Sequence, residues 1–216
     1  KISVKLDDKK HELAGFETLV YKNNSTQTLN SLYMHVWPNA YKDEHSALAK
    51  QLKRIGDDKI GKAEPQDLGN MSGLDFKING QAVKWEFTKE NQDIVLLQLP
   101  FGLAPGQSLT LTTPFEVKIP SGSISRLGHI GQSYQITQWY PKPAVYDQNG
   151  WNQMPYFNQG EFYSEYGSFD VEITVPSNYV VGATGELQTE AEIAFLDEKV
   201  KQSAKKLENL LAQEDG

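Results

Sequence analysis

Cysteine is absent from the 216 residues of this sequence, and histidine occurs only 4 times. Disulfide bridges and thiolate metal sites are therefore excluded. No apolar run approaches the roughly 20 residues that a membrane-spanning helix needs, so we expect no membrane span. The sequence shows no signal peptide. It begins at Lys1 without an initiator Met, which is compatible with a processed, exported protein.

Positive charge is also scarce, with 21 Lys and Arg against 28 Asp and Glu and a formal net charge of −7. Such an acidic balance argues against a phosphate backbone as a partner, so we expect no nucleic acid. A chain of this length forms one large domain or two small ones. It can bury roughly 70% of its unfolded surface, which is enough for a core without covalent staples.

Complete catalytic motifs are missing as well. His11-Glu12 begins like the H-E-x-x-H zinc motif, but Gly15 stands where the second His is required. The surrounding pattern is also strand-like, and a strand does not bring positions i and i+4 together. Neither a G-x-S-x-G nucleophile motif nor a phosphate-binding loop is present. We therefore predict that this chain is not itself catalytic and holds neither a metal nor a cofactor of its own.

Alternation of apolar and polar residues with period two dominates the sequence and predicts strands. Asn79-Gly80 between two alternating runs is typical of a β-hairpin turn. Residues 42–55 change to a helical period, and residues 56–73 read as a loop. The predicted fold is mainly β, a sandwich or sheet domain with one inserted helix. The expected strands are the hairpin of residues 1–22 and the segments 32–37, 76–85, 94–99, 109–119, 134–140 and 169–175.

The composition changes after Gln188. Thr189-Glu190-Ala191-Glu192 has the spacing of a capping box, in which the first and last side chains bond each other's backbone amides. Apolar residues then recur at three- and four-residue spacing, which predicts an amphipathic C-terminal helix. We expect a β-domain over residues 1–188 and a helical linker or insertion over residues 189–216, within a longer parent protein.

Aromatic residues concentrate between Trp139 and Tyr166, where nine occur in 28 positions. In a polar, Gly- and Pro-punctuated segment this density is found at recognition surfaces, but a structural rim that packs against the rest of a sheet is the simpler interpretation. Just before it, an extended segment from Tyr134 to Tyr140 places Gln138 and Tyr140 on one strand face. Gln138 offers a donor pair and an acceptor, and Tyr140 offers a ring with a hydroxyl, so both are candidate substrate-binding residues.

Several of these pieces occur in an order that resembles the N-terminal β-domain of bacterial aminopeptidase-N-like zinc metallopeptidases, the gluzincin aminopeptidases. The resemblance covers most of residues 1–188. It is carried by Leu13-Ala14-Gly15-Phe16-Glu17, Leu32-Tyr33-Met34-His35-Val36-Trp37-Pro38-Asn39-Ala40-Tyr41, Arg126-Leu127-Gly128-His129, Thr137-Gln138, Gly167-Ser168-Phe169-Asp170-Val171-Glu172-Ile173-Thr174-Val175-Pro176 and Val180-Val181-Gly182-Ala183-Thr184-Gly185.

The resemblance implies a twisted, saddle-like β-domain that packs on a thermolysin-like catalytic domain located further along the parent chain. In that family the strand with Thr/Ser-Gln helps to hold the free amino terminus of a peptide substrate, which assigns this role to Gln138. Two residues on, where the family often has Glu or Gln, this chain has Tyr140. Zinc would belong to the parent enzyme rather than to this chain, and a periplasmic or extracellular location is expected.

Two other functions stay open at this point. A stand-alone β-sandwich module could bind carbohydrate or protein through a surface that contains Trp139, Tyr146, Trp151 and Tyr156. A purely structural domain would also account for the aromatic segment.

Overall fold

The computed structural model describes residues 1–214 of the chain. They divide into one compact unit, Lys1–Pro176, and a second that begins at Ser177. The first unit is mostly β, as the alternation predicts, and the second contains the C-terminal helix.

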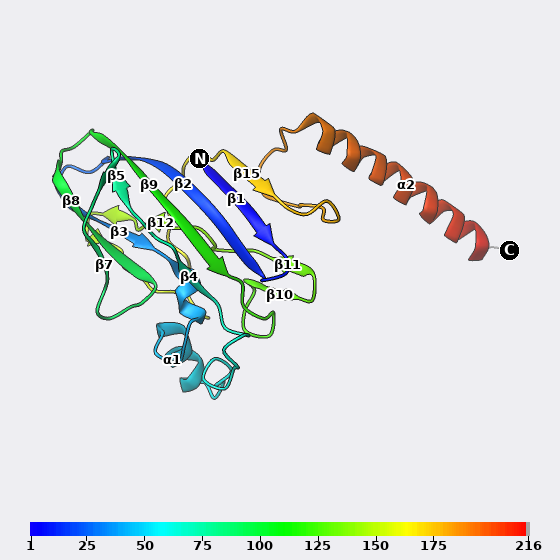
Figure 1. Cartoon of the computed structure of the whole chain (residues 1–216), viewed down its shortest axis with the longest axis horizontal. Helices are drawn as coiled ribbons and strands as arrows, with labels where there is room; N and C mark the ends of the chain where they lie inside the picture. Colours follow the sequence, from blue (N-terminus) through cyan, green and yellow to red (C-terminus); the bar gives the residue numbers. More distant parts are fainter. Residues whose placement is uncertain (215–216) are drawn as a thin grey trace. The chain divides into compact units, whose positions relative to one another are not determined.

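A seven-stranded sheet forms the larger layer of the first unit (Figure 1). Its strand order is β15-β1-β2-β9-β5-β6, and β4 also pairs with β9. The predicted N-terminal hairpin is confirmed, because β1 and β2 pair antiparallel over six positions. The strands are β1 (Ile2–Asp7), β2 (Glu12–Lys22), β4 (Asn70–Ser72), β5 (Lys77–Ile78), β6 (Gln81–Ala82), β9 (Ser108–Lys118) and β15 (Val171–Thr174).

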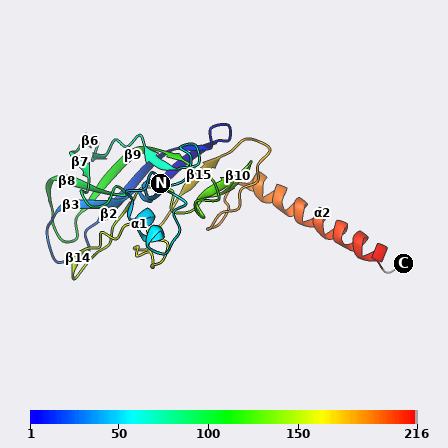
Figure 2. The same ribbon diagram turned by 90° about the horizontal axis from the view of Figure 1, so that it is seen from below.

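A second, four-stranded sheet has the order β12-β3-β8-β7. Two short hairpins, β10-β11 and β13-β14, lie outside both sheets. Figure 2 shows the strands from a second direction, with β3, β7 and β8 gathered together. The strands are β3 (Leu29–His35), β7 (Trp85–Phe87), β8 (Ile94–Leu103), β10 (Gly128–Ile130), β11 (Ser133–Gln135), β12 (Lys142–Pro143), β13 (Tyr146–Asp147) and β14 (Gly150–Trp151).

The core is built from the apolar positions of both large sheets. Leu32 and Met34 of β3, Leu97 of β8, and Leu111 and Phe115 of β9 are all at most 1% exposed. Burial of this kind contributes roughly 25 cal/mol for each Å² of apolar surface removed from water. Strand pairing and core packing therefore support the same arrangement.

Short helices interrupt the strands after β3. Pro38 lies in a 3-10 helix, η1 (Trp37–Tyr41), as expected for a residue that ends a strand. The predicted inserted helix is α1 (Ala47–Arg54), and the Ser46 hydroxyl accepts a hydrogen bond from the Ala49 amide at its N-terminus. The C-terminal helix α2 (Glu190–Glu214) starts directly after Thr189. None of the helices among residues 1–214 is long and apolar enough to span a membrane.

Three local features refine the predicted strands. Residues 56–73 are not entirely a loop, because β4 pairs with β9 there. Strand β9 has neighbours on both sides, and Pro114 lies at an interruption in its pairing. Its outer neighbour changes from β5 to β4 around Pro114, an interruption that accommodates a residue without an N–H. All four residues of β15 are exposed, although alternation of apolar and polar residues is typical of a half-buried strand.

The turn in the β5-β6 hairpin has the predicted chemistry. Asn79 and Gly80 both have positive φ, at 50° and 82°, as a two-residue hairpin turn of the mirror-image type requires. The Asn79 carboxamide also accepts a hydrogen bond from the Thr110 amide of β9. The loop thereby ties the hairpin to the large sheet.

Candidate substrate-recognition site

The segment that carries Gln138 is not the extended strand that its sequence predicts. Strand β11 ends at Gln135, because its partner β10 supplies only three paired positions. Three residues later Gln138 has a φ of 53°, in the left-handed region. The chain therefore turns here, and the expected common face of Tyr134, Gln138 and Tyr140 is not formed. Gln138 and Tyr140 are both half-buried on an irregular loop.

Lys142 fixes the carboxamide of Gln138. The Lys142 ammonium donates a hydrogen bond of 3.3 Å to Oε1 of Gln138. The same ammonium lies 4.2 Å from the centre of the Trp37 ring, which is a cation–π geometry. Burial lowers the pKa of Lys142 to about 8. Both the neutral amine and the charged ammonium of Lys142 are therefore accessible near physiological pH.

His35 and Trp37 form the floor behind Lys142. Their rings stack with centroids 4.6 Å apart, and each side chain is 2% exposed. Burial, aided by the charge of Lys142, lowers the pKa of His35 to about 4, so its imidazole is neutral at pH 7. His35 Nδ1 and Trp37 Nε1 have no hydrogen-bond partner among residues 1–214. Buried polar atoms without partners are uncommon and require an explanation at each site.

Tyr140 has different neighbours from Gln138. Its ring makes edge-on contacts with Trp139 and Phe169, at 5.3 Å and 5.9 Å between centroids. Burial raises the pKa of Tyr140, and the charge of Glu17 raises it further. Glu17 is itself 3% exposed, and burial raises its pKa to about 8. Within residues 1–214 no hydrogen bond links Gln138 with Tyr140, so the two predicted residues belong to adjoining but separate groups of side chains.

The four aromatics of the alternative binding surface do not form one exposed wall. Tyr156 is 3% exposed and packs edge-on against Tyr41. Trp151 packs against Tyr146, with centroids 5.0 Å apart, and Trp139 packs near Phe115. Most of the aromatic density therefore serves packing between the irregular segment and the sheets.

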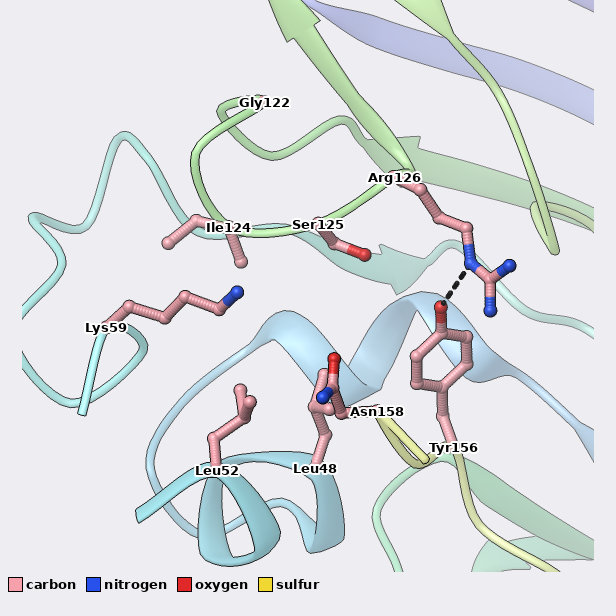
Figure 3. A pocket seen from close by; sticks show the side chains of 9 residues that line it. All are labelled: Leu48, Leu52, Lys59, Gly122, Ile124, Ser125, Arg126, Tyr156 and Asn158. Carbon is pink, nitrogen blue, oxygen red and sulfur yellow. Dashed lines mark hydrogen bonds between the residues drawn. The ribbon is translucent and has the colours of Figure 1, made fainter. Parts of the chain in front are cut away.

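A cavity of about 460 Å³ lies elsewhere in the first unit (Figure 3). It is bounded by α1, by the loop before β10 and by the segment that follows β14. Neither Gln138 nor Tyr140 lines it. The lining residues are Leu48, Leu52, Lys59, Gly122, Ile124, Ser125, Arg126, Tyr156 and Asn158.

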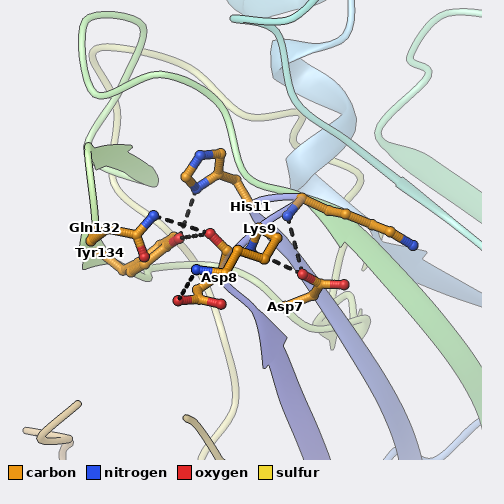
Figure 4. A network of polar contacts seen from close by, with 7 residues as sticks. Asp7, Asp8, Lys9, His11, Gln132 and Tyr134 are labelled. Atoms are coloured by element: carbon orange, nitrogen blue, oxygen red, sulfur yellow. Dashed lines mark hydrogen bonds and ion pairs between the residues drawn. The ribbon is translucent and has the colours of Figure 1, made fainter. Parts of the chain in front are cut away.

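Two of the four histidines meet at the turn between β1 and β2. Figure 4 shows His11 of this turn beside Tyr134. The rings of His11 and His129 stack there, and His11 Nδ1 shares a hydrogen bond of 2.7 Å with the Tyr134 hydroxyl. This contact was not predicted, because the two loops are far apart in sequence. Among the side chains that the structure describes, no group of three or more His, Cys, Asp and Glu is arranged to hold a metal ion.

Sequence reasoning missed Lys142 and Glu17. Lys142 lies between Pro141 and Pro143, a context that gives no hint of burial. Glu17 does carry a detectable signal, because it shares its strand face with the buried Leu13 of β2. A charged residue on the apolar face of an amphipathic strand indicates either a partner or a shifted pKa.

Comparisons with known proteins give a distant structural likeness. No family model matches the sequence, and no curated protein matches it. A two-domain M1 zinc metallopeptidase mutant bound to L-tryptophan is 17% identical with a TM-score of 0.32, over 53% of this chain and 18% of that chain. An M1 zinc metallopeptidase mutant from Deinococcus radiodurans bound to a Tyr-Ser-Ala substrate is 17% identical with a TM-score of 0.31, over the same shares of both chains. The M1 zinc metallopeptidase from Deinococcus radiodurans is 18% identical with a TM-score of 0.30. This chain spans 18% of the length of these structures.

Proposed function

We propose that this chain is the non-catalytic N-terminal domain of a zinc aminopeptidase, and that the loop around Gln138 forms one wall of its peptide cleft. The observation that carries the proposal is the conformation of Gln138. A non-glycine residue with a φ of 53° costs about 1–2 kcal/mol, and such residues cluster at functional sites. The carboxamide of this residue is the one that the resemblance assigns to the amino terminus of a substrate.

The chemistry around Gln138 supports recognition of a small polar group. Its Oε1 accepts one hydrogen bond from Lys142 and has a second lone pair, and its Nε2 offers two donors. The neighbouring Thr137 hydroxyl is buried without a hydrogen-bond partner among residues 1–214. A peptide amino terminus with its first carbonyl supplies both donors and an acceptor for such a group of atoms.

An uncovered apolar edge supports the presence of a further polypeptide. Val171 and Ile173 of β15 pair with Ile2 and Val4 of β1 and so continue the buried face of the sheet. They are 40% and 41% exposed, and the adjacent Phe169 is 59% exposed. A contiguous exposed apolar surface is typical of a protein interface. The proposed occupant is the downstream catalytic domain of the same parent chain.

Zinc would belong to that catalytic domain. Residues 1–214 provide no ligand set for it, and no step of the reaction is assigned to this chain. The proposed roles of the chain are to bind and orient the substrate. A periplasmic or extracellular location is part of the proposal and follows from the same resemblance.

The coding sequence beyond Gly216 gives the first test. It should contain an H-E-x-x-H motif within about 200 further residues, the span of roughly one additional domain. If that segment lacks the motif, the assignment to zinc aminopeptidases fails.

Two substitutions at Gln138 then test the recognition role in the longer protein. Gln138→Ala and Gln138→Gly both remove the carboxamide, but only glycine favours the positive φ. We expect kcat/KM for an aminoacyl reporter substrate to fall by about tenfold in both variants, as for the loss of one hydrogen bond to a charged group. Wild-type activity in the glycine variant would show that Gln138 serves the backbone alone.

A further inference from the structure

We infer that the cavity beside α1 binds a carboxylate attached to a branched aliphatic group. Its volume of about 460 Å³ falls within the range of small-molecule sites. This site is separate from Gln138 and does not depend on the proposed peptidase function. The inference rests on the distribution of charge, on the apolar side chains of the lining and on how firmly the walls are held.

Charge in the cavity is opposite in sign to the chain as a whole. The protein carries a net charge of −7, yet the nine lining residues include Lys59 and Arg126 and no Asp or Glu. Within the described residues, no carboxylate pairs with Arg126, whose Nε donates to the Tyr156 hydroxyl at 3.3 Å. Lys59 pairs with Asp57 at 3.6 Å, and both side chains are more than a third exposed. Such an ion pair contributes little to stability, so a ligand carboxylate can readily replace Asp57 as the partner of Lys59.

Three apolar side chains contribute to the lining of the cavity, each at most 4% exposed. Leu48 and Leu52 project from α1, and Ile124 faces them from the loop before β10 (Figure 3). The same view shows the Lys59 ammonium and the Asn158 carboxamide in the space between Ile124 and the two leucines, with Arg126 beyond Tyr156. A cation and a carboxamide next to three apolar side chains fit an amphiphilic anion better than an inorganic ion.

Hydrogen bonds hold both walls in place. The Ser125 hydroxyl donates to the Tyr41 hydroxyl at 3.0 Å, and the Ile124 amide donates to the Ser121 carbonyl at 2.9 Å. On the opposite wall, the Asn158 amide donates to Oε1 of Gln51 in α1 at 2.7 Å. A site with fixed walls loses little entropy on binding, so even a small ligand can be retained.

A matched pair of ligands tests the role of charge. We would titrate the 216-residue protein with 4-methylpentanoate and with its neutral amide, 4-methylpentanamide, and follow backbone amides by NMR. The acid should shift the signals of Ser125 and Asn158, and the amide should bind about tenfold more weakly because it lacks charge-assisted hydrogen bonds. Equal binding of acid and amide would overturn the proposal, and so would shifts that avoid the cavity.

Variants test the cation. Lys59→Gln should weaken binding of the acid by about fivefold or more, the loss expected for one ionic hydrogen bond at a partly exposed site. Lys53→Gln on the exposed face of α1 should leave the affinity unchanged. An unchanged affinity in Lys59→Gln would contradict the inference, and circular dichroism verifies that this exposed substitution leaves the fold intact.

The source of the carboxylate is distinguished by a third ligand. N-acetyl-leucine mimics the C-terminal residue of a peptide, whereas 4-methylpentanoate mimics a free branched-chain acid. Tighter binding of N-acetyl-leucine assigns the site to a peptide C-terminus, and tighter binding of the simple acid assigns it to a small metabolite. If neither acid binds more tightly than 4-methylpentanamide, the carboxylate site does not exist.

Discussion

The imidazole rings of His11 and His129 stack with centroids 3.7 Å apart and an angle of 10° between their planes. His11 lies in the turn between β1 and β2 at a φ of 56°, and His129 lies in β10. Tyr134 completes the contact by a hydrogen bond to His11 and by another to the Asp8 carbonyl at 3.3 Å. The β10-β11 hairpin is thus anchored on the sheet by titratable groups (Figure 4).

This stack predicts an acid-sensitive contact. Burial lowers the pKa of His11 below its ordinary value of 6.5, and His129 lowers it further, while Asp8 and Asp7 oppose both effects. The unfolded chain therefore binds more protons below pH 6.5, and the stability contributed by neutral His11 is lost as pH falls through its folded pKa.

His129→Gln should raise the pKa of His11 toward its ordinary value, because it removes a neighbouring cationic group. NMR titration of the imidazole carbons measures the pKa. The same substitution at the exposed His45 provides the control and should leave His11 unaffected. An unchanged pKa of His11 in His129→Gln would show that the stacked ring has no electrostatic influence.

Burial of Glu17 should give the free energy of unfolding the opposite dependence on pH. Burial raises its pKa from 4.5 to about 8, so the folded state binds more protons than the unfolded chain between these values. The free energy of unfolding should therefore fall as pH rises from about 4.5 to about 8. Glu17→Gln should remove that slope and be the more stable protein at pH 8 by about 1–3 kcal/mol.

Urea denaturation at pH 5 and pH 8 measures the effect. Glu116→Gln is a suitable control, because Glu116 is an exposed residue of the neighbouring strand β9. If the free energy of unfolding of Glu17→Gln still falls between pH 5 and pH 8, another group is responsible for the titration.

The charge on Lys142 should make the proposed binding of a substrate amino terminus depend on pH. Its ammonium lies beside Gln138 and repels a second cation, and burial sets its pKa at about 8. In the longer protein, Lys142→Met should therefore lower KM for a free-amine substrate at pH 7 by a few-fold, and the difference should fade above pH 8. Comparison of the two proteins at each pH cancels the titration of the substrate amine. A constant ratio of KM values would mean that the substrate amine binds away from Lys142.

Local patterns were enough to predict much of the β-structure. The alternation of Ile2, Val4 and Leu6 identified a buried strand face, and Asn79-Gly80 identified a hairpin turn. Both are properties of neighbouring residues. β4 was missed because a three-residue strand depends on its partner β9 rather than on its own pattern. The exposure of β15 could not be predicted either, since alternation indicates only which side is apolar and not whether anything covers it.

The candidate site was less accessible to sequence reasoning. Gln138 was identified from a motif, but its backbone turn was not, because glutamine carries no strong preference for positive φ. Lys142, Trp37 and His35 come from separate parts of the chain, and only tertiary packing brings them together. The cavity beside α1 has the same origin, since its walls come from α1 with the loop that follows it, from the loop before β10 and from the segment after β14.

The backbone of Gln138 yields a final prediction that needs only this chain. Glycine accepts positive φ without a Cβ penalty, whereas alanine does not. Gln138→Gly should therefore be more stable to urea than Gln138→Ala by about 1 kcal/mol, although both lack the same carboxamide. At Gln135, which lies in the regular strand β11, the order of stability should reverse, so that Gln135→Gly is less stable than Gln135→Ala. Equal stability of the two Gln138 variants would mean that this residue is not held in the left-handed conformation, and the strained turn would lose its role in the proposed cleft.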